Sequence, residues 1–180
     1  CNLVSIIEPY QRRSPLNKMM QKYKNKSEKY RLEIAIYGRN CSYKGFDQLI
    51  QNAIKINSEN NNSIKWTFLG VNMSDLEKYL PKNKDCLSNS IIIKSKRYSE
   101  KSLFNLLTAS DLTICAYKDM TQSGILIDAM CTGLDILTLD YEFTKEIDEY
   151  PGLIRVKDLE DINRFLTSKY HGLNLERRKK

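Results

Sequence analysis

Short apolar runs alternate along this chain with longer segments in which apolar residues recur every three or four positions. The apolar runs, each about four to six residues long, predict buried β-strands at six places. These are Leu32–Tyr37, Ile64–Leu69, Ser90–Lys94, Leu112–Ala116, Leu134–Leu139 and Leu153–Val156. The periodic segments predict helices over Phe46–Ile56, Ser74–Leu80, Glu100–Ala109, Ser123–Cys131 and Leu159–Leu166, whereas Tyr141–Glu149 is irregular or helical.

Alternation of strands with helices of about ten residues is typical of parallel βαβ units, whose right-handed crossovers bury the sheet between two layers of helices. We therefore expect an α/β fold: a Rossmann-like, doubly wound parallel sheet of about six strands with helices on both faces. Such a sheet binds its ligands at the carboxyl ends of its strands. The loops that follow the strands are accordingly the first place to look for chemistry.

The chain divides by charge and periodicity into three segments. Residues 31–168 are expected to form the Rossmann-like domain, residues 1–30 a linker with a basic amphipathic helix, and residues 169–180 a basic tail. The amphipathic helix begins at Ser14-Pro15 and places four apolar side chains on one face: Leu16, Met19, Met20 and Tyr23. That face either packs on this or a neighbouring domain or lies on an anionic membrane surface.

The net charge of +7 is unevenly distributed. Residues 1–31 carry +6 and residues 169–180 carry +4, which leaves −3 for the middle of the chain. A nucleic-acid-binding domain usually carries its basic patch on the folded face, so this distribution argues against nucleic acid as a partner. Each apolar run is far shorter than the roughly 20 residues needed to span a bilayer.

The five cysteines form no CxxC pair, and His171 is the single histidine. This composition argues against a metal site and against a cysteine nucleophile, which needs a nearby base. Cys115 and Cys131 lie in apolar segments and are expected to be reduced core thiols of a cytoplasmic protein. Because the chain starts at Cys1 without an initiator Met, we expect the true N-terminus to lie further upstream.

The loop after the first predicted strand runs from Gly38 to Gly45 and opens a helix. Arg39 and Lys44 bring two positive charges to that helix N-terminus, where the helix dipole also favours anions. The pattern suits a diphosphate, although it is neither a Walker P-loop nor GxGxxG. The alternative is an ordinary solvated loop that contains two basic residues.

A second polar loop, from Tyr117 to Gly124, follows the strand that ends in LTICA. Thr121, Ser123 and the backbone amides at the start of the next helix can donate hydrogen bonds to a phosphate. A plain helix N-cap by Thr121 or Ser123 would use the same residues. The two interpretations are compatible, because a capped helix with spare amides still binds anions.

Asp128 lies on the same helix, one turn beyond Gly124, so both residues can face the same ligand. The usual task of a carboxylate at such a place in a nucleotide site is to accept hydrogen bonds from two ribose hydroxyls. The alternative is a solvated charge on the helix surface.

These features occur together in one known family. Residues 31–166 resemble the C-terminal half of a GT-B glycosyltransferase, of the retaining, nucleotide-sugar-dependent superfamily that includes bacterial polysaccharide and lipopolysaccharide transferases. The resemblance rests on GR…KG after the first strand, on Leu69-Gly70, and on the stretch AYKDMTQSGILIDAMCTGLDIL. It implies two Rossmann-like domains that face each other across a cleft, of which the C-terminal domain binds the donor nucleotide sugar.

The resemblance also implies roles for individual residues. The donor diphosphate would be held by Gly38, Arg39, Lys44, Thr121, Ser123 and Gly124. Asp128 takes the place of the family's Glu on the ribose. The base would lie around Lys96 to Ser99, and further base or sugar contacts would come from Tyr98, Tyr117, Asp119 and Gln122.

One departure from the family concerns catalysis. The family often has two Glu residues, of which the first falls here on Met120 and the second on Asp128. This chain is similar to members that carry a Thr/Ser-Gln-Ser-Gly turn in place of the first Glu. Because that Glu usually contacts the sugar, the catalytic residues are unassigned and the retaining or inverting outcome stays open.

For function, the resemblance implies the donor-binding half of an enzyme that moves a sugar from a UDP- or GDP-sugar to a glycan or lipid-linked acceptor in cell-surface polysaccharide synthesis. No metal or other cofactor is expected, because Arg, Lys and the helix dipole would stabilise the leaving diphosphate. The acceptor domain would precede Cys1, so this fragment alone should bind donor without transferring sugar. A cytoplasmic position at the inner face of the plasma membrane fits the basic ends.

Two other classes of protein stay open. A catalytically inactive GT-B-like domain would bind only a nucleotide or a protein partner, and the missing first Glu motivates this alternative. A different Rossmann-like enzyme, such as a sugar-nucleotide epimerase or a dehydrogenase, is disfavoured because no GxGxxG follows the first strand.

Overall fold

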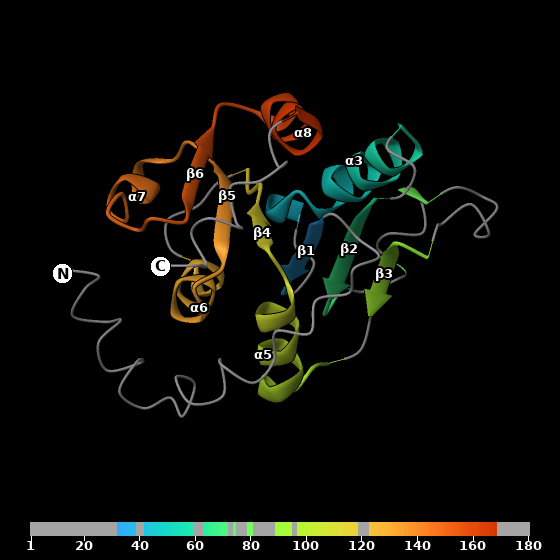
Figure 1. The fold of residues 1–180 in the computed structure, drawn as a ribbon, viewed down its shortest axis with the longest axis horizontal. Helices are drawn as coiled ribbons and strands as arrows, with labels where there is room; N and C mark the ends of the chain where they lie inside the picture. Colours follow the sequence, from blue (N-terminus) through green and yellow to red (C-terminus); the bar gives the residue numbers. More distant parts are fainter. Residues whose placement is uncertain are drawn as a thin grey trace.

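The structure, a computed structural model, describes residues 32–38, 42–59, 63–71, 74, 79–80, 89–94, 97–118 and 123–168 (Figure 1). The amphipathic helix expected to begin at Ser14, the basic tail and most of the helix expected over Ser74–Leu80 lie outside these residues. Among the residues described, no helix has both the length and the apolar character needed to cross a membrane.

In the described part of the chain, six parallel strands form one sheet in the order β3-β2-β1-β4-β5-β6. The strands are β1 (Leu32–Tyr37), β2 (Ile64–Leu69), β3 (Ile91–Lys94), β4 (Leu112–Cys115), β5 (Asp135–Leu139) and β6 (Leu153–Val156). The chain moves outward from β1 to β3, returns to the other side of β1, and moves outward again from β4 to β6. The order therefore reverses between β1 and β4, and such a switch point is where an open α/β sheet leaves a crevice for ligands.

Helices cover both faces of this sheet (Figure 1). Their bounds are η1, a 3-10 turn (Ser42–Lys44), α3 (Phe46–Glu59), α5 (Glu100–Ala109), α6 (Gly124–Thr132), α7 (Glu142–Lys145) and α8 (Leu159–Ser168). On one face α3 packs against α8, and on the opposite face α5 packs against α6. The turn η1 links β1 to α3, so it lies at the carboxyl end of β1.

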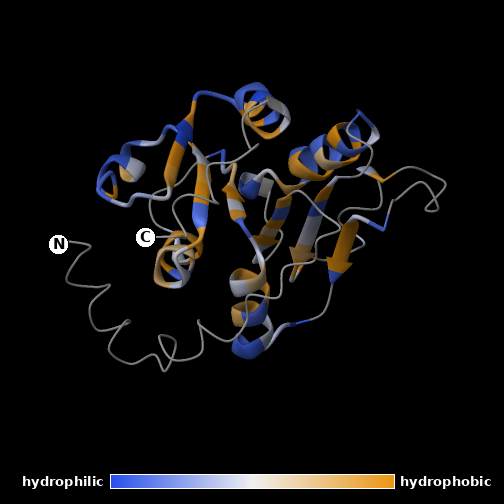
Figure 2. Cartoon of the chain, viewed as in Figure 1, coloured by the Kyte–Doolittle hydropathy of each residue, from blue (hydrophilic) through white to orange (hydrophobic). Residues whose placement is uncertain are grey.

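The core explains why the strands are mostly apolar in the sequence. Every residue of β1 is buried, because helices cover both faces of the sheet at its centre. Trp66 and Phe68 belong to the core shared with α3 and α8, whereas Leu69 belongs to the core shared with α5 and α6. Figure 2 shows the helices turning their hydrophobic residues toward the sheet and their hydrophilic residues outward.

The predicted fold class is confirmed. Three strands, β1, β2 and β6, have the predicted bounds, and each of the other three differs by one residue at one end. The helix α3 runs to Glu59 rather than Ile56, because its last three residues are polar and extend the helix without extending the apolar pattern.

The two cysteines differ from each other in burial. Cys115 is a free, buried thiol, as expected, and burial raises its pKa to about 12. Cys131 is also free but only half-buried, because it lies in the groove between α5 and α6 rather than beneath them. Its prediction as a core thiol is therefore wrong.

Candidate functional site

The described parts of the two polar loops that the sequence singles out lie side by side at the switch point. One follows β1 and the other follows β4, and these strands are hydrogen-bonded neighbours in which Ala35 lies opposite Thr113. The backbone amide of Lys118 donates to the carbonyl oxygen of Tyr43 over 2.6 Å. At Gly45 a Cβ atom would lie 2.5 Å from the carbonyl oxygen of Ala116, so the loops approach each other backbone to backbone.

Lys44 points into this junction from the end of η1. Its Nζ lies 5.5 Å from the centre of the Tyr117 ring, a cation–π distance. A Cβ atom on Gly38 would lie 2.9 Å from the same Nζ and 3.3 Å from Cδ1 of Ile125, in the first turn of α6. Because Gly38 has no side chain, the ammonium group of Lys44 and the start of α6 converge on one point.

The aromatic ring of Tyr117 lies under the ammonium group of Lys44. Its side chain is buried, and its ring meets the exposed ring of Tyr43 edge-on at 5.9 Å between centres. Its hydroxyl accepts a hydrogen bond from Ser123 Oγ at 3.4 Å. The assignment of Tyr117 as a base or sugar contact stays a prediction.

The first turn of α6 supplies the second half of an anion site. Ser123 is the N-cap residue, yet its hydroxyl makes no capping bond to the helix and is directed to Tyr117 instead. Gly124, the first helical residue, is exposed, and a Cβ atom there would meet nothing within 4 Å. An open helix N-terminus beside a lysine ammonium favours a phosphate.

Tyr37, at the last position of β1, is a site residue that sequence reasoning missed. Its hydroxyl donates to the carbonyl oxygen of Ile125 over 2.7 Å, so it ties the first turn of α6 to the end of β1. Burial, and after it the charge of Asp128, raise the pKa of Tyr37 well above its ordinary value. The sequence signal that could have indicated Tyr37 is its position: a tyrosine, with its polar hydroxyl, ends a mostly apolar strand directly before Gly38.

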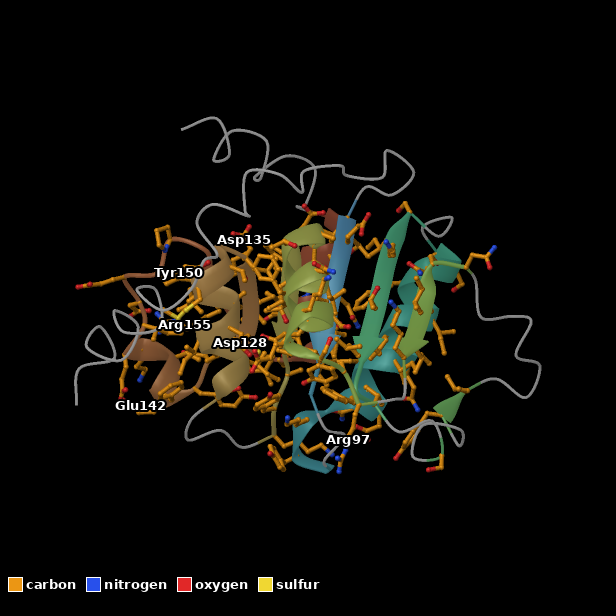
Figure 3. The ribbon with its side chains drawn as sticks, turned by 90° about the horizontal axis from the view of Figure 1, so that it is seen from below. Arg97, Asp128, Asp135, Glu142, Tyr150 and Arg155 are labelled. Atoms are coloured by element: carbon orange, nitrogen blue, oxygen red, sulfur yellow. The ribbon has the colours of Figure 1, made fainter. Side chains whose placement is uncertain are left out.

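Asp128 lies in the second turn of α6 and faces α5 (Figure 3). Together with residues of both helices, among them Glu100, Leu103 and Cys131, it lines a groove of about 370 Å³. Its carboxylate makes no hydrogen bond or ion pair with any described residue, and burial raises its pKa from 3.8 to about 6. A solvated charge on the helix surface, the alternative raised by the sequence, does not fit this half-buried position.

Tyr98 comes from the loop between β3 and α5. Its ring packs against Gly70 so closely that a Cβ atom there would overlap it, and the same Cβ would lie 3.2 Å from the carbonyl oxygen of Gly38. Tyr98 thereby stacks the turn after β2 on the turn after β1. It lies near the candidate site but on the β2 side of it.

The structure thus brings together six of the predicted residues around the switch point: Gly38, Lys44, Tyr117, Ser123, Gly124 and Asp128. Arg39, Thr121, Asp119 and Gln122 lie outside the described residues, and their assignments stay predictions.

Comparison with known proteins gives a consistent result. No protein-family model matches the chain. A curated relative, the uncharacterized glycosyltransferase MJ1069 of Methanocaldococcus jannaschii, is 29% identical over 164 residues, which are 89% of this chain and 40% of the relative. The chain therefore spans about 40% of the length of the curated relative that it matches.

Two solved structures extend the comparison to the fold. The C-terminal domain of a glycosyl transferase group 1 family protein (LpcC) from Francisella tularensis superposes with a TM-score of 0.60 at 22% identity, over 82% of this chain and 79% of that domain. A complex of a single-residue mutant of S. aureus TarM with UDP, fondaparinux and α-GlcNAc-glycerol superposes with a TM-score of 0.64 at 16% identity, over 84% of this chain and 31% of TarM.

These comparisons confirm the resemblance predicted from the sequence. The chain has the fold of the C-terminal domain of a GT-B glycosyltransferase, and one curated glycosyltransferase is similar to most of its length.

Proposed function

We propose that this chain is the donor-binding domain of a glycosyltransferase, which moves a sugar from a nucleotide-diphosphate sugar to a glycan or lipid-linked acceptor. The observation that carries the proposal is the convergence of Lys44 Nζ and the first turn of α6 on Gly38, at the switch point of the sheet. The likeness to glycosyltransferases supports it, and the UDP bound to TarM is the kind of donor nucleotide that such a site would take.

The diphosphate would lie between Lys44 and the amides that open α6. Both groups are positive where the leaving diphosphate gains negative charge, so both would stabilise the transition state of sugar transfer without a metal. Lys44 acts as a point charge held in place by the face of Tyr117. Arg39 and Thr121, from the same two loops, would add further contacts to the phosphates.

Asp128 would accept hydrogen bonds from the ribose hydroxyls. Asp128 lies one turn along α6 from Gly124, so a nucleotide whose phosphate lies at Gly124 would bring its ribose to Asp128. The groove beside Asp128 has room for a nucleoside. Binding a pair of hydroxyls would satisfy a half-buried carboxylate that has no other partner among the described residues. The base would then reach the loop before α5, around Lys96 to Ser99.

The wider assignment follows the resemblance. We infer a UDP- or GDP-sugar as donor, a role in cell-surface polysaccharide or lipopolysaccharide synthesis, and an acceptor that is bound by a separate N-terminal domain. The basic ends of the chain support a cytoplasmic location against an anionic membrane surface.

A second candidate function is an inactive GT-B-like domain that binds a nucleotide or a protein partner. Met120, where the family often has its first Glu, favours this alternative. Sugar transfer by the full-length protein would exclude it, whereas nucleotide binding without turnover would support it.

The donor-binding proposal is tested by calorimetric titration of the chain with UDP, GDP, ADP and CMP at two salt concentrations. Saturable one-site binding of a nucleoside diphosphate, with a modest salt dependence, is the expected result. Binding to a nucleic acid would instead weaken steeply with salt. Absence of binding by all four nucleotides would contradict the assignment of a donor site to this domain.

A further inference from the structure

The loop to which we assign the donor base borders a pocket of about 460 Å³ at the carboxyl ends of β2 and β3. Arg97 and Tyr98 of this loop line the pocket, and Figure 3 shows Arg97 beyond the ends of the strands. Leu69 and Lys94, the last residues of β2 and β3, lie opposite each other in the register of the two strands and line it as well. The pocket is therefore the part of the proposed donor site in which the base would lie, and its lining decides which base fits.

Two observations connect this pocket to the rest of the donor site. The ring of Tyr98 packs on Gly70, and a Cβ atom on Gly70 would lie 3.2 Å from the carbonyl oxygen of Gly38. Burial and the charge of Asp128 raise the pKa of Tyr37, and the charge of Tyr98 adds to the shift. Tyr98 and Asp128 thus both lie near Tyr37. A nucleotide with its ribose on Asp128 can therefore place its base beside Tyr98.

Part of the pocket lining is cationic. Lys94 and Arg97 are exposed, and neither forms an ion pair with any residue that the structure describes. Ammonium and guanidinium groups donate hydrogen bonds and accept none. Of the described residues that line the pocket, none is an aspartate or glutamate, and Glu100 in the first turn of α5 lines the groove at Asp128 instead. The cations therefore favour a base edge that carries acceptors and disfavour one that carries an amino group.

The rest of the lining is mostly apolar. Leu69, Leu106 and the ring of Tyr98 belong to one core cluster, so they present a continuous apolar surface to the pocket. Ser102 of α5 adds a hydroxyl, whose oxygen lies 3.0 Å from that of Ser99 and can accept as well as donate a hydrogen bond. A base in this pocket therefore meets two cations, one hydroxyl and an apolar surface.

Uracil matches this lining better than the other three ribonucleotide bases. One edge of uracil carries two carbonyl oxygens and a single N–H, and the other edge carries only C5–H and C6–H. Cytosine and adenine carry an amino group, which would meet the two cations. Guanine has polar atoms on both edges, among them the N1–H and N2 donors, which need an acceptor. A donor that enters such a pocket without an acceptor weakens binding.

We propose that the sugar donor is a UDP-sugar, selected by hydrogen bonds from Lys94 and Arg97 to the carbonyl oxygens of uracil. The N3–H between these oxygens donates to the Ser102 hydroxyl, and the C5–C6 edge lies against Leu69 and Leu106. The inference rests on the proposed donor-binding function and narrows its donor from a UDP- or GDP-sugar to a single base.

Calorimetric titration of the 180-residue chain with UDP and CDP isolates the base, because the two ligands share the ribose and the diphosphate. UDP should bind at least about tenfold more tightly than CDP, and GDP and ADP should also bind more weakly than UDP. Tighter binding of CDP, GDP or ADP than of UDP, at a site that needs Lys44, would overturn the choice of uracil and leave the donor site standing. Absence of binding by all four nucleotides would overturn both.

Two variants, Arg97→Gln and Lys94→Gln, test the residues that select the base. Glutamine both donates and accepts hydrogen bonds, so it can pair with a carbonyl or with an amino group. Each variant should weaken UDP by about threefold to tenfold and bring the affinities for UDP and CDP closer together. Lys101→Gln removes an exposed charge of α5 outside the pocket lining, and it should leave both affinities unchanged.

Lys44→Ala separates selection of the base from binding of the phosphates. This variant should weaken UDP and CDP by the same factor, so the ratio of the two affinities should stay that of the parent chain. A ratio that is unchanged in both Arg97→Gln and Lys94→Gln would overturn the proposal, because the base would then be selected by other groups.

Discussion

The hydroxyl of Tyr37 donates to the carbonyl oxygen of Ile125 over 2.7 Å, across 88 residues of sequence. This bond joins the carboxyl end of β1 to the first turn of α6, and both groups are buried. Gly38 follows Tyr37 directly and lies against Lys44 Nζ. One hydrogen bond therefore sets the spacing between the lysine and the helix N-terminus that we assign to the diphosphate.

Removing that bond should affect both stability and nucleotide binding. In Tyr37→Phe the Ile125 carbonyl loses its partner in a buried position, so we expect the free energy of unfolding to fall by about 1–3 kcal/mol. Binding of a nucleoside diphosphate should weaken as well, because the first turn of α6 loses its anchor. Urea denaturation and calorimetric titration measure the two effects.

A matched control for this variant is available in the same chain. Tyr150 donates to the carbonyl oxygen of Leu134 at 2.8 Å, away from the switch point. Tyr150→Phe should reduce stability similarly and leave nucleotide affinity unchanged. Equal losses of nucleotide affinity in the two variants would show that Tyr37 has only a general structural role.

Lys44→Ala should weaken a nucleoside diphosphate by roughly 1.5–3 kcal/mol, the scale of a hydrogen bond to a charged group. Uridine, which carries no phosphate, should bind the variant and the parent equally. Lys55→Ala removes an exposed lysine from α3 and serves as the control for net charge. If Lys44→Ala lowered the affinity for uridine and UDP alike, the assignment of Lys44 to the phosphates would be wrong.

Gly38→Ala tests the close approach at the junction. The residue has φ = 110°, which favours glycine, and the added Cβ would lie 2.9 Å from Lys44 Nζ. We expect a loss of about 1–2 kcal/mol in stability from the backbone and a loss of nucleotide affinity from displacement of the lysine. Gly133→Ala, at φ = 70° with open space around it, should lower stability similarly and leave the nucleotide affinity unchanged. Intact nucleotide affinity in Gly38→Ala would contradict the convergence of Lys44 and α6.

We expect the Asp128 carboxylate to lower the stability of the fold at neutral pH and to strengthen nucleotide binding. Burial raises its pKa from 3.8 to about 6, so the folded state holds this proton more firmly than the unfolded state. The resulting stabilisation is fully present below about pH 4 and is lost as the pH rises through about 6. At about pH 7.5, Asp128→Asn should raise the free energy of unfolding by on the order of 1 kcal/mol, a value discounted because the carboxylate is partly exposed.

The same variant should bind nucleotide less tightly, since the neutral amide replaces an ionised acceptor of ribose hydroxyls. Denaturation at about pH 4 and pH 7.5, with Glu149→Gln as an exposed-carboxylate control, measures the stability effect, and uridine titration measures the binding effect. A stability gain that is equal at both pH values would show that burial of the charge is not its cause.

The fold could be predicted from the sequence because the strands are covered on both faces and are therefore mostly apolar. LEIAIY and IKWTFL are mostly apolar and lie between polar segments, so both strands were predicted with their observed bounds. The loops after β1 and β4 could be singled out for the same reason, since strand ends locate the ligand edge of such a sheet. The strand order, and with it the switch point between β1 and β4, required the structure.

The contacts within the site could not be predicted from the sequence, because they join residues far apart in the chain. Nothing local to Tyr37 indicates that its hydroxyl meets Ile125, and nothing near Tyr117 indicates that its ring lies under Lys44. For Asp128, its place one turn beyond Gly124 suggested a contact with the ligand, but its half-buried position depends on the packing of α5 against α6.

A crystal structure of the chain with UDP, or with whichever nucleoside diphosphate it binds most tightly, tests the central claim most directly. We expect the diphosphate within hydrogen-bonding distance of Lys44 Nζ and the first amides of α6, with the ribose hydroxyls on the Asp128 carboxylate. A nucleotide bound away from the junction of β1, β4 and α6 would contradict the account.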